Sequence, residues 1–374
     1  MKVVLVSNFL NHHQIPFCEE MLKRCKDFYF LATDNGASQG YQTTCEKPYV
    51  VDYKKECEKA EQIVLDADAV IFGSCPNSLI KLRMDENKLS FFYSERFFKK
   101  GTWRRFIPTT RKSINNRIIQ FKDKNIFVLC AGAYLPYDLS LLGFPTDKCF
   151  KWGYFPDCEL DAELENKFPA SILWSARMLD WKHPEIPVLV AEKLKKNGYK
   201  FTMNIVGEGE KLEETKALVK QKNVDDCVNF LGSLPHDELL SQMRKHKIFL
   251  MTSDKYEGWG AVLNEAMSSH CVPVASHAIG SVPFLIENGK NGLIFKSQNA
   301  NDAYKKVKKL LDNSDMLEEM GNEAYKTMNE NYNYTVAAER LMVMIEGLCQ
   351  NGKMLTYSNG LLSKAEIIKD NSLR

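Results

Sequence analysis

Short, continuous apolar runs recur along the whole chain. Each is four to seven residues long and rich in β-branched or aromatic side chains. Runs of this kind are typical of strands that are buried on both faces of a sheet. We therefore predict eleven buried β-strands, at residues 3–7, 28–32, 69–73, 89–94, 126–132, 171–176, 201–207, 227–232, 248–253, 272–276 and 292–295.

Amphipathic stretches of about 10–15 residues separate most of these runs, for example residues 183–198 and 210–223. Alternating strands and helices are typical of parallel α/β sheets with right-handed crossovers. Eleven strands exceed one comfortable open sheet. The pattern therefore predicts an α/β fold with two doubly wound, Rossmann-like domains. We place the boundary near 150–171, where Pro, Gly and acidic residues interrupt the alternation.

The end of the chain is predicted to be helical up to Asn351. Beyond Asn351 the sequence is polar and weakly patterned, which predicts a loosely packed tail. No segment approaches the roughly 18–20 consecutive apolar residues of a membrane-spanning helix. The first residues are too short an apolar run for a signal peptide, and we expect a strand there.

Composition narrows the class of protein. The chain has 374 residues, of which 44% are hydrophobic and 26% charged, as in soluble globular proteins. Its eleven cysteines include no C-x-x-C pair, which argues against zinc-ribbon and thioredoxin-like sites. Unpaired cysteines are typical of a reducing compartment. We expect a cytoplasmic protein.

The most informative stretch is residues 253–276, where a loop follows one predicted strand and an apolar helix precedes the next. Gly258 and Gly260 in this loop allow the backbone to approach a ligand closely. A helix start presents free N–H groups to an anion. Glu257 and Glu265 flank it, and carboxylates accept hydrogen bonds from vicinal hydroxyls. Sugar on both sides of a diphosphate, as in a nucleotide sugar, would fit this arrangement.

The spacing of Glu257 and Glu265, with seven residues between them, resembles the E-x7-E motif of family 4 glycosyltransferases. A bare E-x7-E motif carries no weight, but the surrounding segments also match, and in the order that the family has. They are the strand and helix with Arg and Lys at 171–194, the Gly-x-Gly turn at 206–214, the base-pocket segment at 229–243 and the closing strand and loop at 272–295. The resemblance covers roughly residues 170–345; over 1–150 it is only architectural.

This resemblance implies a GT-B fold, in which two Rossmann-like domains face each other across a cleft. Residues 156–334 would be the donor-binding domain, and residues 1–155 the acceptor-binding domain, completed by C-terminal helices within 335–374. Family members are retaining enzymes that use no metal and no cofactor. The family's account of the reaction is a front-face substitution, in which the leaving phosphate takes the acceptor's proton.

The resemblance also implies roles for single residues. Arg177 and Lys182 would hold the donor's diphosphate, which agrees with the need for fixed cations where phosphoryl charge develops. Glu257 would bind hydroxyls of the transferred sugar, and Glu265 the ribose. Backbone N–H groups would come from Gly258, Trp259 and Gly260, and the nucleotide pocket would include Gly207 and Leu234. Two positions depart from the family: His270 replaces a usual Gly, and Phe284 a frequent Glu.

Contacts from the N-terminal domain are predicted from position. The segment Asn11, His12, His13 and Gln14 follows the first strand, and ligands of doubly wound folds lie beyond the carboxyl ends of strands. We expect acceptor or donor-sugar contacts there; N-capping and local packing are the alternative. Glu95 ends another strand. The family often has a sugar-binding His nearby, so Glu95 or the His12–His13 loop would replace it.

Charge is distributed unevenly. Residues 1–155 contain 23 basic and 17 acidic side chains, and residues 96–122 contain nine basic and no acidic ones. Aromatic residues are interspersed in this run. An anionic membrane attracts such a segment; nucleic acid binding and a solvated face are the alternatives, and nucleic acid is the least favoured. The residues predicted to dock are Lys99, Lys100, Trp103, Arg104, Arg105 and Phe106.

The sequence thus predicts a retaining glycosyltransferase that moves a hexose or N-acetylhexosamine from a nucleotide diphosphate sugar, with UDP favoured. The acceptor would be a hydroxyl of a glycan, or of a polyprenyl-diphosphate-linked glycan, in cell-surface polysaccharide synthesis. The enzyme would lie on the inner face of the membrane. The alternatives are a non-hydrolysing nucleotide-sugar epimerase and a non-catalytic protein that binds nucleotide sugar or lipid.

Overall fold

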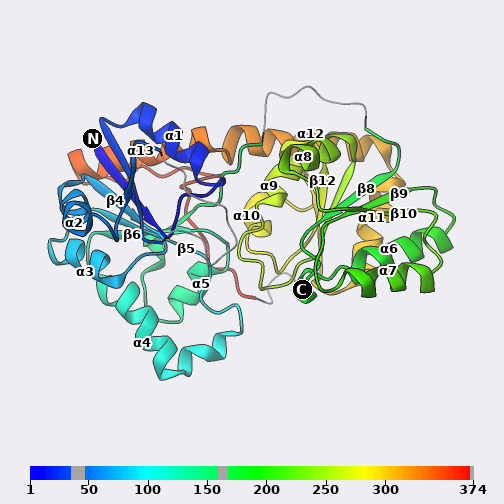
Figure 1. The fold of residues 1–374 in the computed structure, drawn as a ribbon, viewed down its shortest axis with the longest axis horizontal. Helices are drawn as coiled ribbons and strands as arrows, with labels where there is room; N and C mark the ends of the chain where they lie inside the picture. The colour runs from blue at the N-terminus through cyan, green and yellow to red at the C-terminus, as the bar shows by residue number, and fades with distance from the viewer. Residues whose placement is uncertain (35–46, 159–166, 371–374) are drawn as a thin grey trace. The chain divides into compact units, whose positions relative to one another are not determined.

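Two separate parallel sheets form the framework of the chain (Figure 1). The structure is a computed structural model that describes residues 1–34, 47–158 and 167–370. It divides into two compact units. Unit 1 comprises Met1–Asp157 and Tyr332–Lys369, and unit 2 comprises Cys158–Asn331 together with Asp370. The prediction of an α/β fold with two Rossmann-like parallel sheets is confirmed.

Unit 1 contains a seven-stranded sheet with the order β3-β2-β1-β4-β5-β6-β7. The first strand lies third from the β3 edge, and successive strands extend the sheet outward on both sides of it, as in doubly wound folds. The strands are β1 (Lys2–Ser7), β2 (Asp27–Ala32), β3 (Val50–Asp52), β4 (Ala69–Phe72), β5 (Ser90–Ser94), β6 (Ile126–Cys130) and β7 (Cys149–Lys151).

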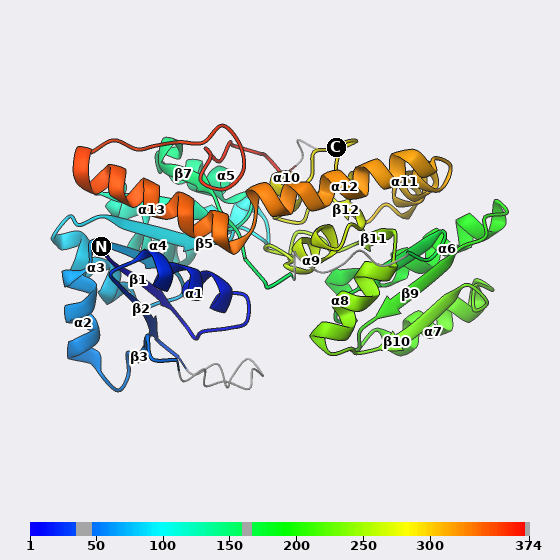
Figure 2. The same cartoon turned by 90° about the horizontal axis from the view of Figure 1, so that it is seen from above.

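The α-helices of unit 1 connect these strands, apart from the last one. They are α1 (Ile15–Arg24), α2 (Cys57–Asp66), α3 (Asn77–Asp85), α4 (Pro108–Arg117), α5 (Leu135–Ser140) and α13 (Tyr334–Asn351). Short 3-10 turns lie at Thr102–Phe106, Ile119–Phe121 and Thr146–Lys148. Although α13 comes from the far end of the chain, it lies beside α1 in both views (Figures 1 and 2). Its apolar side chains thereby complete the core of unit 1.

Unit 2 contains a six-stranded sheet with the order β10-β9-β8-β11-β12-β13. Every described strand pair in it is parallel, so the carboxyl ends of the strands share one edge. The strands are β8 (Ser171–Ser175), β9 (Thr202–Val206), β10 (Val228–Gly232), β11 (Ile248–Met251), β12 (Val272–Ser276) and β13 (Leu293–Phe295).

The helices of unit 2 pack in two groups. Helix α6 lies beside α7 and α11, whereas α9 lies beside α8 and α12. Their bounds are α6 (Glu185–Lys196), α7 (Leu212–Gln221), α8 (His236–Lys245), α9 (Val262–Ser268), α10 (Val282–Leu285), α11 (Ala300–Leu311) and α12 (Ser314–Asn331), and a 3-10 turn, η5, spans Asp180–Lys182. Apolar side chains of α6 such as Val190 and Leu194 bury against Ile172 and Trp174 of β8.

All eleven predicted strands are present, and the sequence patterns missed β3 and β7. Each of these two has only three residues and lies at an edge of the unit 1 sheet, where a strand needs no long apolar run. The predicted loose tail is wrong for part of its length. Leu361 and Leu362 are buried, and residues 362–365 hydrogen-bond with β7.

No helix among the described residues is both long enough and apolar enough to cross a membrane.

Candidate functional site

The predicted donor-site residues follow the carboxyl ends of neighbouring strands in unit 2. Arg177 and Lys182 come after β8, Gly207 after β9, Leu234 after β10 and Glu257 after β11. Because β10, β9, β8 and β11 are adjacent and parallel, these ends lie along one edge of the sheet. This edge is where doubly wound folds bind ligands.

The structure brings Lys182 and Glu257 into direct contact, although 75 positions separate them in the chain. The Lys182 ammonium donates a hydrogen bond to Oε2 of Glu257. Both side chains are largely buried, with 12% and 11% of their surface exposed. A buried charge is costly unless it is paired, so each side chain offsets the burial of the other in this position.

Both hydrogen bonds described for the Glu257 carboxylate are accepted by the same oxygen, Oε2. Oε2 also accepts a hydrogen bond from the Ser253 hydroxyl at 2.9 Å. The other oxygen, Oε1, accepts none from the described residues and is open to hydroxyl donors. The Lys182 ammonium lies 4.3 Å from the centre of the Trp181 ring, which favours its charge by a cation–π interaction.

Arg177 differs from Lys182 because its side chain is exposed. No side-chain hydrogen bond or ion pair joins its guanidinium to another of the described residues. The five N–H donors of a guanidinium suit bidentate binding of a phosphate or carboxylate. Lys182 and Arg177 therefore offer one engaged cation and one free cation at the same edge of the sheet.

Gly207 is required by steric contact. Its φ is +129°, and a Cβ at this position would lie 1.9 Å from the carbonyl oxygen of Ala176. Its N–H donates to the carbonyl of Gly232 at 2.7 Å. The turn after β9 thus packs directly on the backbone that precedes Arg177. Gly207 serves the shape of the site through backbone contact.

The loop after β11 is built around a buried tryptophan. The Trp259 side chain is 1% exposed, donates from Nε1 to Oδ1 of Asn264 at 2.9 Å, and packs against the Phe284 ring. Its ring is therefore part of the core, which leaves only its backbone for the predicted ligand contact. Gly258 is buried, and Gly260 has φ +83° with Met251 where a Cβ would stand.

Glu265 lies in the first turn of α9 and is buried. Burial raises the pKa of its carboxyl, and the charge of His236 opposes that shift. His236 Nδ1 lies 4.0 Å from Oε1 of Glu265. Leu234, two residues before His236 on the same loop, is partly buried. A buried carboxylate at the start of a helix, with His236 4.0 Å away, can accept hydrogen bonds from a ligand that brings hydroxyl donors.

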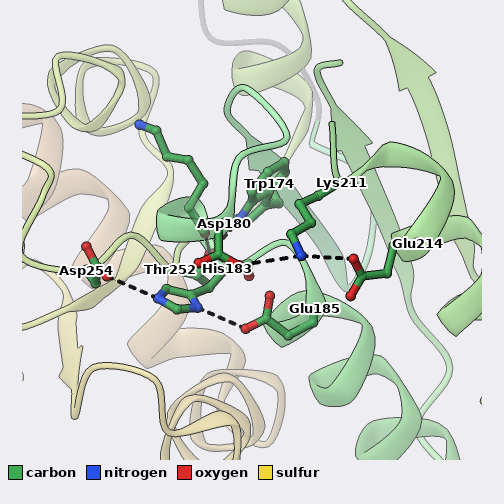
Figure 3. A network of polar contacts seen from close by, with 9 residues as sticks. Trp174, Asp180, His183, Glu185, Lys211, Glu214, Thr252 and Asp254 are labelled. Carbon is green, nitrogen blue, oxygen red and sulfur yellow. Dashed lines mark hydrogen bonds and ion pairs between the residues drawn. The ribbon is translucent and has the colours of Figure 1, made fainter. Parts of the chain in front are cut away.

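Sequence reasoning missed His183 and Asp254, which form a polar network next to Lys182 (Figure 3). Nδ1 of His183 is 2.9 Å from Oε1 of Glu185, and Nε2 is 3.4 Å from Oδ2 of Asp254. These two carboxylates, that of Asp254 more strongly, raise the pKa of His183 to about 9. The sequence signal that could have found them is their nearness to predicted residues: His183 follows Lys182, and Asp254 lies three residues before Glu257.

No three side chains of His, Cys, Asp or Glu are grouped so that they could hold a metal ion in the described part of the chain.

In unit 1, the predicted contact segment follows β1 and makes mostly local bonds. Oδ1 of Asn11 accepts a hydrogen bond from the N–H of His13 at 3.0 Å, and Oε1 of Gln14 accepts from the N–H of Asn11 at 3.4 Å. The rings of His12 and His13 lie 3.7 Å apart. Asn11 and Gln14 thus shape the turn before α1.

Tyr154 links two of the predicted residues of unit 1. Its hydroxyl donates to Oε1 of Glu95 at 2.7 Å, and its ring stacks on His13 at 6.2 Å between centroids. Glu95 also pairs with Lys99 at 2.5 Å. Sequence reasoning missed Tyr154 because the short strand before it, β7, was not predicted. The carboxyl ends of β1, β5 and β7 therefore form a cluster of aromatic and charged groups.

The basic segment 96–122 is less uniform than its composition indicated. Lys99 is engaged with Glu95, and Arg96 forms a buried ion pair with Asp138. Trp103 and Phe106 are 58% and 72% exposed. The guanidinium groups of the two arginines between them lie over these rings, Arg104 at 5.9 Å and Arg105 at 4.5 Å. Lys100 is exposed as well.

The two departures from the family pattern have structural explanations. His270 has a left-handed backbone, with φ +56°, which is the conformation that a glycine adopts most easily. The His270 ring stacks on the Tyr325 ring, with 4.1 Å between centroids, and its Nδ1 contacts Asn322. These two contacts hold the His270 side chain in place. Phe284 is buried against Trp259.

A comparison with protein families finds a match within unit 2. Residues 159–327 match the family described as glycosyl transferases group 1. The match covers the segments that carry Arg177, Lys182, Gly207, Glu257 and Glu265.

Two curated relatives extend this similarity. An uncharacterised glycosyltransferase of Methanocaldococcus jannaschii is 24% identical over 73% of this chain and 66% of its own length. The poly(ribitol-phosphate) alpha-N-acetylglucosaminyltransferase of Staphylococcus aureus is 28% identical over 42% of this chain and 31% of its own length. The chain thus spans less than two thirds of either relative.

The fold extends the likeness to nearly the whole chain. The structure of Anabaena HepE in complex with UDP has a TM-score of 0.70 at 12% identity, covering 93% of this chain and 100% of that protein. The two-sheet architecture is accordingly that of GT-B glycosyltransferases. This chain is therefore similar to glycosyltransferases by fold over almost its entire length. By sequence, the similarity to glycosyl transferases group 1 lies in unit 2.

Proposed function

We propose that this protein is a retaining glycosyltransferase that transfers a hexose or N-acetylhexosamine from a UDP-sugar to a glycan hydroxyl. The observation that carries the proposal is the Lys182–Glu257 contact, which lies at the same carboxyl edge of the unit 2 sheet as the free guanidinium of Arg177. A cation next to a carboxylate with an open oxygen suits a ligand that joins phosphate to a sugar.

The chemistry follows from these groups. Arg177 and Lys182 stabilise negative charge that grows on the diphosphate as its bond to the sugar breaks. Glu257 orients the sugar by accepting hydrogen bonds from its hydroxyls through Oε1. The acceptor oxygen bonds to the anomeric carbon on the face that the diphosphate leaves, and its proton passes to the leaving phosphate oxygen. Glu265 binds the ribose diol. The proposed reaction needs no metal and no cofactor.

The relatives support the choice of donor and acceptor class. The Staphylococcus aureus relative is named for transferring N-acetylglucosamine to poly(ribitol-phosphate). Another relative, from Salmonella typhimurium, is named as a putative colanic acid biosynthesis glycosyltransferase, and the Anabaena structure contains UDP. We therefore propose a role in cell-surface polysaccharide synthesis.

The surface of residues 99–106 supports a membrane-bound acceptor. Exposed Trp103 and Phe106 alternate with Lys100, Arg104 and Arg105, and such a surface binds anionic lipid through its cations and its apolar rings. We propose that the protein docks on the cytoplasmic face of the inner membrane and glycosylates a polyprenyl-diphosphate-linked glycan. Nucleic acid is not part of this proposal.

Co-sedimentation with vesicles at about 0.1 M salt tests the docking. The wild type should bind vesicles that contain anionic lipid better than neutral ones, and a Trp103→Ala/Phe106→Ala variant should bind both weakly. Leu355→Ala is the matched control, because Leu355 is 55% exposed and lies outside this surface. Equal binding of the wild type to neutral and anionic vesicles would refute electrostatic docking.

The activity is tested by thermal shift and nucleotide release with a panel of UDP-, GDP- and ADP-sugars in EDTA. We expect one UDP-sugar to stabilise the protein and to release UDP slowly without metal. Release of free UDP together with an isomerised sugar would favour the epimerase instead. The transferase proposal fails if no donor stabilises the protein and none is cleaved.

A further inference from the structure

His183 has an unusual backbone next to Lys182. It lies between η5 and α6 with φ +52° and ψ +58°, in the left-handed region that is unfavourable for a residue with a Cβ. A strained residue persists only where its surroundings hold it. The contacts of its side chain and backbone must therefore hold His183 in this conformation.

Two carboxylates from different parts of the chain hold the imidazole. Glu185 comes from the first turn of α6, and Asp254 comes from the loop after β11. Figure 3 shows the ring between them. Its Nδ1 lies 2.9 Å from the Glu185 carboxylate, and its Nε2 lies 3.4 Å from the Asp254 carboxylate. The side chain of His183 is 15% exposed. The ring thus joins the loop after β8 to the loop after β11.

Backbone contacts reinforce the same junction. The Thr252 hydroxyl lies 2.6 Å from the carbonyl oxygen of Lys182 and 3.2 Å from that of His183, and it accepts a bond from Nε1 of Trp174. The N–H of Asp254 donates to the carbonyl of Trp181 at 3.0 Å. The loop on both sides of His183 is therefore tied to residues 252–254.

These two loops carry the two charged groups of the proposed donor site. We propose that His183 is a positioning residue, whose ring is hydrogen-bonded to Glu185 and ion-paired with Asp254 and locks the Lys182 loop onto the Glu257 loop, so that the ammonium and carboxylate stand ready for the donor. The inference rests on the proposed function for its effect on turnover. The junction itself can be tested without any substrate.

The charge on His183 links this junction to pH. Its pKa is raised to about 9, above the value of about 6.5 expected in the unfolded chain. The stabilisation from its two carboxylates is thus complete below about pH 6.5 and is lost as pH rises through about 9. An open cleft of about 690 Å³ gives water access to the ring. The other charged groups around it are Asp180, Lys182, Lys211, Glu214 and Glu257.

His183→Asn is the test variant, because asparagine tolerates the left-handed backbone but carries no charge. His270→Asn is the matched control. His270 is also left-handed and also belongs to unit 2, but it precedes β12 and so lies at the opposite edge of the sheet. A strain effect would appear in both variants, whereas a positioning effect would appear only in the first.

Two substrate-free readouts test the junction. In NMR titrations the ring of His183 should titrate near pH 9, and Asp254→Asn should lower this midpoint by at least one pH unit. Amide exchange at residues 254–257 should accelerate about tenfold or more in His183→Asn and stay unchanged in His270→Asn. A midpoint near pH 6.5 in the wild type, or unchanged exchange in His183→Asn, would overturn the proposal.

The kinetic readout uses the UDP-sugar that the wild type cleaves. We expect His183→Asn to lower kcat about tenfold or more with a smaller change in KM, and to lack the loss of activity that the wild type shows between pH 8 and 9.5. A normal kcat in His183→Asn would contradict the positioning role. If the junction readouts succeed while the wild type cleaves no donor, the proposed function fails and the structural junction stands.

Discussion

The carboxyl edges of the two sheets are organised differently. In unit 2, Lys182 and Glu257 meet directly, and Gly207 packs on the backbone that leads to Arg177. In unit 1, Tyr154 contacts both His13, by ring stacking, and Glu95, by a hydrogen bond. The contacts at the unit 2 edge thus include a close backbone approach at Gly207, whereas those at the unit 1 edge are between side chains. A site with backbone constraints leaves a readable motif in the sequence; a side-chain cluster does not.

The largest expected effect is on turnover, from Lys182→Ala. Removing a fixed cation from developing phosphate charge should lower kcat/KM at least about 10²-fold. The lost partner also leaves the Glu257 carboxylate buried and uncompensated, which should reduce stability by about 3 kcal/mol. Steady-state kinetics and urea unfolding measure the two effects. Lys196→Ala, which removes an exposed lysine paired with Glu192 on α6, should change neither.

Gly207→Ala should disrupt unit 2 more than a glycine replacement elsewhere. The clash with the Ala176 carbonyl adds to backbone strain, so we expect a loss of at least about 3 kcal/mol. Gly198→Ala is the control: its φ is +78°, but no atom lies within 4 Å of the added Cβ. It should cost only about 1–2 kcal/mol. Equal losses in the two variants would mean that the turn after β9 does not constrain the site.

Glu265→Gln should separate stability from binding. Because burial raises the pKa of Glu265, ionisation of this carboxyl costs stability in the folded state. Replacing it with the neutral amide should raise the melting temperature of the ligand-free protein at pH 7, an advantage that should vanish below the unfolded pKa of about 4.3. The same change should weaken UDP binding about tenfold, because a charged acceptor for the ribose is lost. A variant that is stabler and binds UDP normally would remove Glu265 from the nucleotide site.

The smallest expected effect concerns unit 1. Tyr154→Phe removes the hydrogen bond to Glu95 and should cost about 1 kcal/mol of stability. Tyr93→Phe should cost a similar amount, because its hydroxyl donates to the carbonyl of Gly153. Only Tyr154→Phe should raise the KM for the acceptor, by several-fold. An unchanged acceptor KM in Tyr154→Phe would leave the cluster a purely structural feature.

Much of the framework was predictable because buried parallel strands need continuous apolar runs. β3 and β7 were not predicted because three residues at a sheet edge leave no such pattern. Tyr154 was missed for the same reason, because it follows β7. The packed tail escaped because Leu361 and Leu362 are isolated apolar positions in a polar stretch.

The candidate site shows the same division. Glu257 and Lys182 were predicted from the resemblance of their segments to motifs of family 4 glycosyltransferases. His183 and Asp254 were not, because their contact depends on the three-dimensional path of two loops. Charged residues beside a motif give only a weak signal of such a contact.

Binding of UDP tests the central claim, that the edge of the unit 2 sheet after β8 and β11 holds a nucleotide diphosphate. Calorimetric titration in EDTA should compare the wild type, Arg177→Ala and the surface control Lys196→Ala. We predict that the wild type and the control bind UDP alike, and that Arg177→Ala binds at least about tenfold more weakly because a free guanidinium is lost. Equal affinity in all three proteins, or no binding by the wild type, would contradict this account.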